Sequence, residues 1–165
     1  WFVLEPGGGG GVDPPTSVPL TLSAVRDYDP QGDGTENPDD RGLAIDPDPG
    51  TAWFTEQYRD SAEFGGLKDG VGLILRLTEP ATATQMVLVS PTPGARFQVL
   101  GELADDEREV LAEGETTGGE QVIDLATSAP SQAYLLWITS LADDGQGGFW
   151  AGVGKVELRG APNGT

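Results

Sequence analysis

An acidic segment, residues 29–40, holds oxygen-bearing side chains at a spacing that suits metal binding. Asp29, Gln31 and Asp33 alternate along it, and Asp40 closes it. Ca²⁺ takes several oxygen ligands from a bent loop, and this segment supplies such ligands. The fit to a calcium loop is imperfect, because Gln31 replaces a carboxylate and Asp40 replaces a bidentate glutamate. An ordinary turn rich in glycine and aspartate explains the same residues.

The absence of histidine and cysteine narrows the chemistry that the chain can perform. Disulfides, thiolate metal sites and cysteine nucleophiles are impossible, and so are a Ser-His-Asp triad and an imidazole base. Catalysis would therefore depend on carboxylates or on lysine. Lys68 and Lys155 are the only lysines.

The charge balance disfavours some partners. With 9 Lys and Arg against 27 Asp and Glu, the formal net charge is -18. A field of this sign repels phosphate backbones and anionic lipid headgroups, so nucleic acid is not an expected partner. It attracts divalent cations and basic protein surfaces, and it also keeps a protein soluble.

The segments that must position these groups have the pattern of short β-strands separated by Gly, Pro and Asp clusters. This pattern predicts an all-β jelly-roll sandwich. In the clearest strand, Val71 to Leu77, alternate apolar residues share one face that must be core. One helical turn is expected over Asn37 to Ala44, because Pro38 suits a first helical position. The other predicted strands are Leu20–Val25, Ala52–Thr55, Gln85–Val89, Arg96–Leu100, Glu109–Ala112, Gln121–Leu125, Tyr134–Thr139 and Val153–Leu158.

The ends of the chain differ from this middle. Residues 1–19 combine a short apolar patch, Trp1 to Leu4, with a linker rich in Gly and Pro that cannot bury a core. We expect one β-sandwich over residues 20–161 and a tail over 162–165. No apolar run reaches the length needed to cross a bilayer. Because the chain begins at Trp1 instead of Met, we expect it to be a segment of a longer protein.

A second acidic segment resembles a motif of galactose-binding-like domains, the superfamily of discoidin and coagulation-factor type C domains and of many bacterial carbohydrate-binding modules. The segment runs from Ala44 to Trp53. The resemblance implies that Asp46, Asp48 and Thr51 supply oxygens to a structural calcium and that Trp53 packs inside. It also implies a distal ligand from the last strand, in the segment Lys155-Val156-Glu157-Leu158-Arg159-Gly160, where Glu157 takes that role. Pro47 departs from the glycine of the motif and forbids a left-handed turn there, so the loop is rebuilt, the ion is lost, or the carboxylates only cap a turn.

A narrower resemblance extends from about Ala24 to Gly160. Short motifs such as Tyr28-Asp29-Pro30, Phe64-Gly65-Gly66-Leu67-Lys68 and Leu136-Trp137-Ile138-Thr139 resemble the C-terminal ectodomain of actinobacterial MviN-type membrane proteins, which are related to the flippase of lipid-linked peptidoglycan precursors. This resemblance implies upstream transmembrane helices and an extracytoplasmic, membrane-tethered domain that faces the cell wall.

The superfamily resemblance also suggests where a ligand would bind. Lectin-like members hold sugars on loops at one end of the sandwich, where aromatic rings stack on them. The candidate ligand-binding residues of this chain are therefore Tyr58, Arg59, Phe149 and Trp150. Phe149 and Trp150 could instead plug the end of the sandwich, and Arg59 could simply compensate Asp60.

Three classes of function follow. The first is a non-catalytic binding module that recognises a cell-wall glycan, peptidoglycan or an envelope protein. The second is a hydrolase that uses only carboxylates, which needs an acid and a base about 5–10 Å apart. The third is a structural spacer stiffened by an intramolecular Lys-Asn bond, for which Lys68 and Lys155 are the available lysines.

Overall fold

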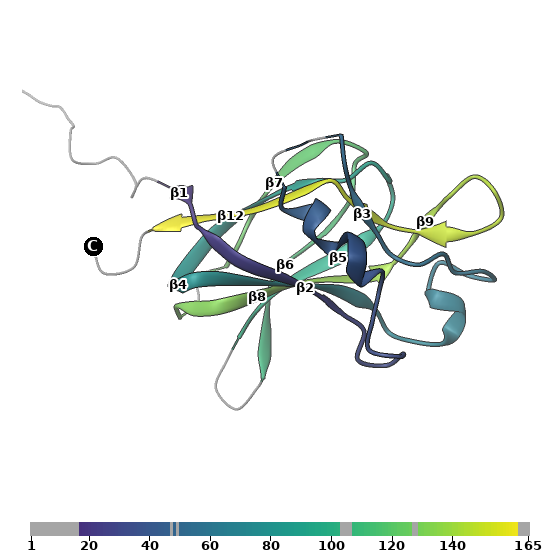
Figure 1. Ribbon diagram of the computed structural model, residues 1–165, viewed down its shortest axis with the longest axis horizontal. Helices are drawn as coiled ribbons and strands as arrows, with labels where there is room; N and C mark the ends of the chain where they lie inside the picture. Colours follow the sequence, from purple (N-terminus) through teal and green to yellow (C-terminus); the bar gives the residue numbers. More distant parts are fainter. Residues whose placement is uncertain (1–16, 47, 49, 103–106, 127–128, 162–165) are drawn as a thin grey trace, which may run out of the picture.

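The computed structural model describes residues 17–46, 48, 50–102, 107–126 and 129–161. They form a twisted sandwich of two antiparallel sheets (Figure 1), which confirms the predicted all-β jelly-roll fold. The larger sheet has the strand order β2-β4-β8-β5-β6, and the smaller sheet has the order β1-β12-β4-β7. Their bounds are β1 Val18–Pro19, β2 Leu22–Tyr28, β4 Val71–Val89, β5 Arg96–Glu102, β6 Arg108–Glu115, β7 Glu120–Asp124, β8 Ser131–Ser140 and β12 Lys155–Ala161.

Strand β4 joins the two sheets. Its first half pairs with β2 and β8, and its second half pairs with β12 and β7. The sequence predicted two separate strands here, Val71–Leu77 and Gln85–Val89. The structure keeps one strand and shifts its register against β8 between Arg76 and Ala81. Pro80 lies within this register shift, where the strand passes from one sheet to the other. A strand tolerates proline there because no ladder hydrogen bond needs a backbone N–H.

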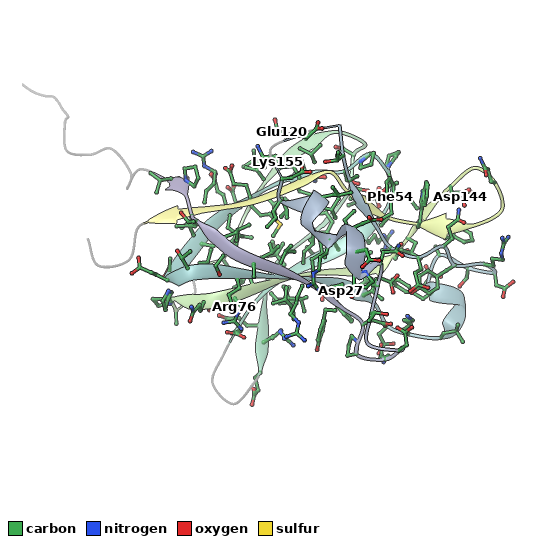
Figure 2. All side chains as sticks on the ribbon, viewed as in Figure 1. Asp27, Phe54, Arg76, Glu120, Asp144 and Lys155 are labelled. Carbon is green, nitrogen blue, oxygen red and sulfur yellow. The ribbon has the colours of Figure 1, made fainter. Side chains whose placement is uncertain are left out.

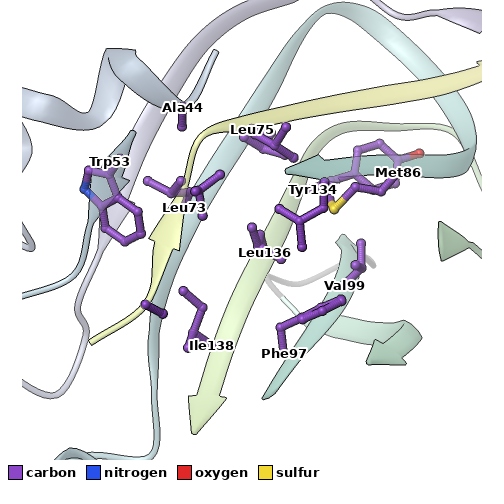
Figure 3. Packing of buried hydrophobic residues seen from close by; sticks show 14 of the residues in the cluster. Ala44, Trp53, Leu73, Leu75, Met86, Phe97, Val99, Tyr134, Leu136 and Ile138 are labelled. Carbon is purple, nitrogen blue, oxygen red and sulfur yellow. The ribbon is translucent and has the colours of Figure 1, made fainter. Parts of the chain in front are cut away.

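The core lies between the two sheets. The predicted inward face of β4 is confirmed, because Val71, Leu73, Leu75 and Leu77 are at most 1% exposed. Leu136 of β8 lies beside Leu73 in the same sheet, and Val99 of β5 lies beyond Leu136 (Figure 3). Burying each such side chain contributes about 1.5–3 kcal/mol, so this layer supplies much of the stability of the fold. Gly72, Ile74 and Arg76 alternate with the buried residues of β4 and lie on the outer face of the sheet.

Charged side chains occupy the outer faces of both sheets. Figure 2 shows Arg76 on the larger sheet and, on the smaller one, Glu120 and Lys155. Arg76 alternates with the buried Leu75 and Leu77, as expected for a strand that is covered on one side.

Short elements connect the strands at one end of the sandwich. The predicted helical turn is confirmed as the 3-10 helix η2, which begins at Pro38 after Asn37 in the left-handed region (φ 51°). Strands β3 and β11 pair with each other, as do β9 and β10. The sequence missed β9, β10 and η3. The bounds are η2 Pro38–Ala44, β3 Trp53–Phe54, η3 Phe64–Gly66, β9 Ala142–Asp143, β10 Phe149–Trp150 and β11 Gly152–Val153.

The start of the sheet lies inside the segment predicted as linker. Val18 and Pro19 form β1 and pair with the end of β12, so the fold begins before residue 20. The apolar patch Trp1 to Leu4, most of the linker and the tail 162–165 lie outside the described residues. Within the described ranges, no helix is long and apolar enough to span a membrane.

Candidate functional site

A pocket of about 340 Å³ opens on the outer face of the larger sheet. Its floor is apolar and is formed by side chains of β5 and β8. Aromatic, amide and charged groups from β2, from β6 and from two loops surround this floor. The lining residues are Tyr28, Pro30, Gln31, Asp69, Gln98, Leu100, Arg108, Leu135 and Trp137.

Strand register brings the central residues of the pocket together. Tyr28 of β2 faces Gly72 of β4, Gly72 faces Trp137 of β8, and Trp137 faces Gln98 of β5. Because Gly72 carries no side chain, the Tyr28 and Trp137 rings meet above it, with centroids 5.8 Å apart and planes tilted by 58°. Gly70 makes room for the indole as well, since a Cβ there would lie 2.6 Å from Trp137 Cε2.

Polar groups of the pocket are held in place by one another. Arg108 Nη1 donates a hydrogen bond of 3.3 Å to Tyr28 Oη, and the guanidinium carbon lies 5.0 Å from the centre of the ring. Gln31 Nε2 donates to Asp69 Oδ2 at 3.0 Å, while the Asp69 amide donates to Gln31 Oε1 at 2.7 Å. The pocket therefore combines two aromatic faces with fixed hydrogen-bonding groups, the combination that small polar ligands require.

Two residues before Gln31 in the sequence, Asp29 belongs to a buried polar cluster. The cluster comprises Asp29, Glu36, Tyr58 and Lys68. Lys68 Nζ is 2.9 Å from Asp29 Oδ1 and 3.7 Å from Glu36 Oε1. Tyr58 donates its hydroxyl to both oxygens of Glu36 at 3.0 Å. Lys68 also lies 5.1 Å from the centre of the Tyr58 ring.

Burial changes the proton affinities in this cluster. Desolvation raises the pKa of Glu36 to about 7, against the opposing effect of the hydrogen bonds that it accepts from the Glu56 amide and from Tyr58. Desolvation also raises the pKa of Tyr58. For Lys68, burial alone would lower the pKa, but the Tyr58 hydroxyl and the Asp29 carboxylate outweigh it and raise the pKa.

The raised pKa of Glu36 predicts how stability depends on pH. Folded protein keeps a proton on Glu36 up to about pH 7, whereas the unfolded chain releases it near the ordinary glutamate pKa of 4.5. The contribution of Glu36 to the free energy of unfolding is therefore full below about pH 4.5. About 2–3 kcal/mol of this free energy is lost as the pH rises through about 7. Urea unfolding of wild type and Glu36→Gln between pH 4.5 and 7.5 tests this. The difference in unfolding free energy should fall across that range, and a constant difference would contradict the prediction.

The four predicted ligand-binding residues lie at the loop end of the sandwich, and none of them lines the pocket. Tyr58 is 9% exposed and belongs to the buried cluster. Phe149 pairs with it through backbone hydrogen bonds, and Trp150 stacks on Phe54 with ring centroids 4.5 Å apart. Arg59 is exposed and contributes to lowering the pKa of Asp144, which the Gln146 and Gly148 amides lower most. Phe149 and Trp150 are half-buried, so they cover the end of the sandwich and still expose part of their rings.

The predicted ligands of the first acidic loop already have protein partners. Asp29 binds Lys68, whose ammonium lies where a cation would approach that carboxylate. Asp33 accepts hydrogen bonds from the amide and hydroxyl of Thr35, and the Thr35 amide lowers the pKa of Asp33. This loop is thus organised by a lysine and by local turn bonds.

The second acidic loop meets the requirements of calcium in part. Thr51 Oγ1 lies 2.9 and 2.8 Å from the carboxylate oxygens of Asp46 and 3.0 Å from the carbonyl oxygen of Asp48. Glu157 forms a 3.3 Å ion pair with Arg159. Trp53 is fully buried, as the resemblance implied. Across the described residues, no three carboxylates form a group suited to a metal, so calcium would need backbone and hydroxyl oxygens as well.

Calcium binding at this loop has a direct test. An ion that binds only the folded state raises the thermal midpoint, so calcium should raise it and a chelator should lower it. Asp46→Asn should remove this response and Asp33→Asn should retain it. Differential scanning calorimetry of the three proteins measures both effects. Wild-type midpoints that do not change with calcium would contradict the predicted ion.

Sequence reasoning missed the pocket residues. Trp137 lies in the run Leu135-Leu136-Trp137-Ile138, which reads as continuous core because its outward-facing residues are apolar too. A signal was present, since alternation along β8 points Leu136 inward and Trp137 outward. Tyr28, Gln98 and Arg108 come from other strands, so their meeting required the strand order.

The sequence matches no known protein-family profile. The fold resembles solved structures of carbohydrate-binding modules. One is a chitosan-binding module from a chitosanase/glucanase of Paenibacillus sp. IK-5, with a TM-score of 0.63 and 12% identity over 88% of this chain and 100% of that one. Another is the family 32 module of C. perfringens NanJ in complex with galactose, with a TM-score of 0.57 and 13% identity over 88% and 98%.

Some similar structures are larger. Truncated AlyQ, with a family 32 module and an alginate lyase domain, matches with a TM-score of 0.62 and 12% identity over 90% of this chain but 34% of that one. The chain thus spans about a third of AlyQ and nearly all of the isolated modules. At these identities the likeness shows the fold alone, a jelly-roll β-sandwich.

Proposed function

We propose that this chain is a non-catalytic glycan-binding module whose ligand stacks on Trp137 in the pocket of the larger sheet. The observation that carries the proposal is the row Tyr28, Gly72, Trp137 and Gln98, in which two aromatic faces adjoin an amide. Sugar rings present apolar C–H faces and a rim of hydroxyls, so they match an aromatic surface with hydrogen-bonding groups beside it. Fold similarity to modules in complex with galactose or named as chitosan-binding supports the same class of ligand.

The charge of the protein disfavours an anionic sugar. A net charge of -18 repels polyanionic glycans at long range, and Asp69 adds a carboxylate at the pocket itself. Arg108 already faces the Tyr28 ring, and it is the only cationic side chain among the described lining residues. A neutral hexose or N-acetylhexosamine therefore suits the pocket better than a uronic acid.

The pocket offers little for hydrolysis. A glycosidase uses two carboxyl groups on opposite sides of the scissile bond. Of the lining residues that the structure describes, Asp69 alone carries a carboxylate, and it is exposed and bound to Gln31. The carboxylates of the buried cluster face Lys68 and Tyr58 instead of the pocket. This arrangement supports binding over catalysis.

We further propose that the module belongs to a cell-envelope protein and faces the cell wall on a membrane tether. The resemblance of its motifs to actinobacterial MviN-type ectodomains supports this location, and the acidic composition suits a domain outside the membrane. Cell-wall glycan is then the natural ligand, with an envelope protein as the second candidate.

Calorimetric titration of the domain tests the proposed function. The panel should hold galactose, N-acetylglucosamine oligomers, soluble peptidoglycan fragments and an alginate oligomer. We expect saturable binding to one of the neutral sugars or peptidoglycan fragments and none to alginate. Absence of binding across the panel, and in pull-downs with purified cell-wall sacculi, would refute the glycan proposal.

A further inference from the structure

The buried polar cluster contains a lysine amine in contact with a carboxyl group and with a second carboxyl group beside it. Lys68 Nζ lies 2.9 Å from Asp29 Oδ1, and Glu36 Oε1 lies 3.7 Å from the same nitrogen. The three side chains are 10%, 1% and 0% exposed, respectively. Asp29 Oδ2 is buried and has no hydrogen-bond partner among the described residues. Pocket binding uses none of these groups.

We propose that Lys68 and Asp29 form an intramolecular amide bond, with Glu36 as the group that transfers the protons. The bond would join Nζ of Lys68 to Cγ of Asp29 and release one water. It would be a covalent cross-link between two loops that lie 39 residues apart in the sequence.

The step balances without a further reactant. In its carboxylate form, which it takes as the pH rises through about 7, Glu36 accepts a proton from the Lys68 ammonium and passes it to the Asp29 carboxylate, which leaves a neutral amine beside a neutral acid. The amine lone pair attacks Cγ, and the C–N bond forms as the carbonyl electrons move to oxygen. Glu36 then takes a second proton from the nitrogen and gives it to the departing hydroxyl. As the C–O bond breaks, water leaves and Glu36 returns to its first state.

The surroundings favour this condensation over its reversal. The Asp29 and Glu36 side chains are at most 1% exposed, and Lys68 and the Tyr58 ring beneath its ammonium are 10% and 9% exposed, so little water reaches the site to hydrolyse the amide. Fixed contact gives the reacting groups a high effective concentration. In well-oriented intramolecular reactions this concentration reaches about 10⁵–10⁸ M. An amide also replaces two buried charges, whose desolvation is costly, with a neutral group.

Contacts beside the cross-link indicate that it would stabilise one side of the pocket. Gln31, two residues after Asp29, and Asp69, the residue after Lys68, hydrogen-bond each other at the rim of the pocket. Gly32 covers the reacting pair, because a Cβ there would lie 2.2 Å from Asp29 Oδ2 and 2.6 Å from Lys68 Nζ. The bond would therefore fix the two loops that shape one side of the pocket.

Intact mass of the purified, folded 165-residue chain tests the proposal. We expect wild type to weigh one water less than its sequence requires. Lys68→Arg, which keeps a cation beside Asp29 but cannot form this amide, should have its full sequence mass, and so should Glu36→Gln. Lys155→Arg is the matched control and should retain the loss. A folded wild-type protein at its full sequence mass after prolonged incubation would overturn the proposal.

A peptide map separates this bond from other losses of water, such as succinimide formation at Asp-Gly sequences. Trypsin should leave the peptide Asp27 to Arg41 linked to the peptide Asp60 to Arg76, with Lys68 uncleaved. Loss of water that persists in Lys68→Arg, or that maps elsewhere, would overturn the assignment. Retention of the cross-link in Glu36→Gln would overturn the role given to Glu36.

Thermal unfolding provides a second readout. Closing a loop of this length constrains the unfolded chain, so the midpoint of Lys68→Arg should fall by roughly 10 °C relative to wild type. Lys155→Arg should unfold at the wild-type temperature. Equal midpoints for Lys68→Arg and wild type would contradict a covalent link between the loops.

Discussion

Replacing Trp137 with alanine is expected to weaken glycan binding about 30-fold or more while the domain remains folded. The indole is the largest aromatic surface in the pocket, and tryptophans at the centre of a binding surface commonly contribute about 2 kcal/mol or more. Trp137 is half-buried on the outer face of β8, so its loss removes little from the core. Calorimetry with the best ligand of the panel measures the change in affinity.

Trp150→Ala is the matched control for this experiment. Trp150 is also half-buried, but it stacks on Phe54 at the loop end, where the superfamily resemblance placed the ligand site. If the pocket binds the glycan, Trp150→Ala keeps wild-type affinity and Trp137→Phe keeps part of it. The reverse pattern, with affinity lost only in Trp150→Ala, would move the site to the loop end and restore the sequence-based ligand residues.

Trp53→Ala should destabilise the fold more than any substitution on the surface, by about 3–5 kcal/mol. The Trp53 side chain is fully buried beside η2, as Figure 3 shows near Ala44 and Leu73. Its indole N–H donates a 2.9 Å hydrogen bond to the carbonyl oxygen of Glu36. The substitution therefore leaves a cavity and an unpaired carbonyl together.

Chemical denaturation measures this loss, with Trp53→Phe as the conservative comparison. Phe fills most of the volume but lacks the N–H donor, so the difference between the two variants separates the packing contribution from the hydrogen bond. A domain of this size is stable by about 5–15 kcal/mol, so Trp53→Ala is expected to remain folded only marginally. A loss below about 1 kcal/mol would show that Trp53 does not anchor η2 to the core.

The sequence was sufficient for the fold because strand alternation is local information. Val71 to Leu77 alternates apolar residues with glycine, isoleucine and arginine, and the structure buries the predicted face. Strand fusion at Pro80 was not predictable in the same way. A proline ends a strand only where the neighbouring strand needs a backbone N–H at that position, because proline has none. Which strand is the neighbour depends on pairing with residues far away in the sequence.

The partners of residues in the candidate site could not be predicted either, because they depend on which distant strands pair. Lys68 pairs with Asp29, which lies 39 residues away in the sequence, although Asp69 is adjacent to it. Tyr58 was expected in a loop that meets ligand, and its hydroxyl binds buried Glu36 instead. The types of the charged and aromatic residues were informative, but their partners were set by the strand order.

Observation of the tryptophan indole N–H signals during a glycan titration tests the central proposal most directly. The chain has 4 tryptophans, so a ¹⁵N-labelled sample gives few indole signals, and Trp137→Phe and Trp150→Phe identify the two that matter. A sugar that stacks in the pocket should shift the Trp137 signal saturably and leave the Trp150 signal in place. Saturable binding that leaves Trp137 unmoved and shifts Trp150 would contradict the account.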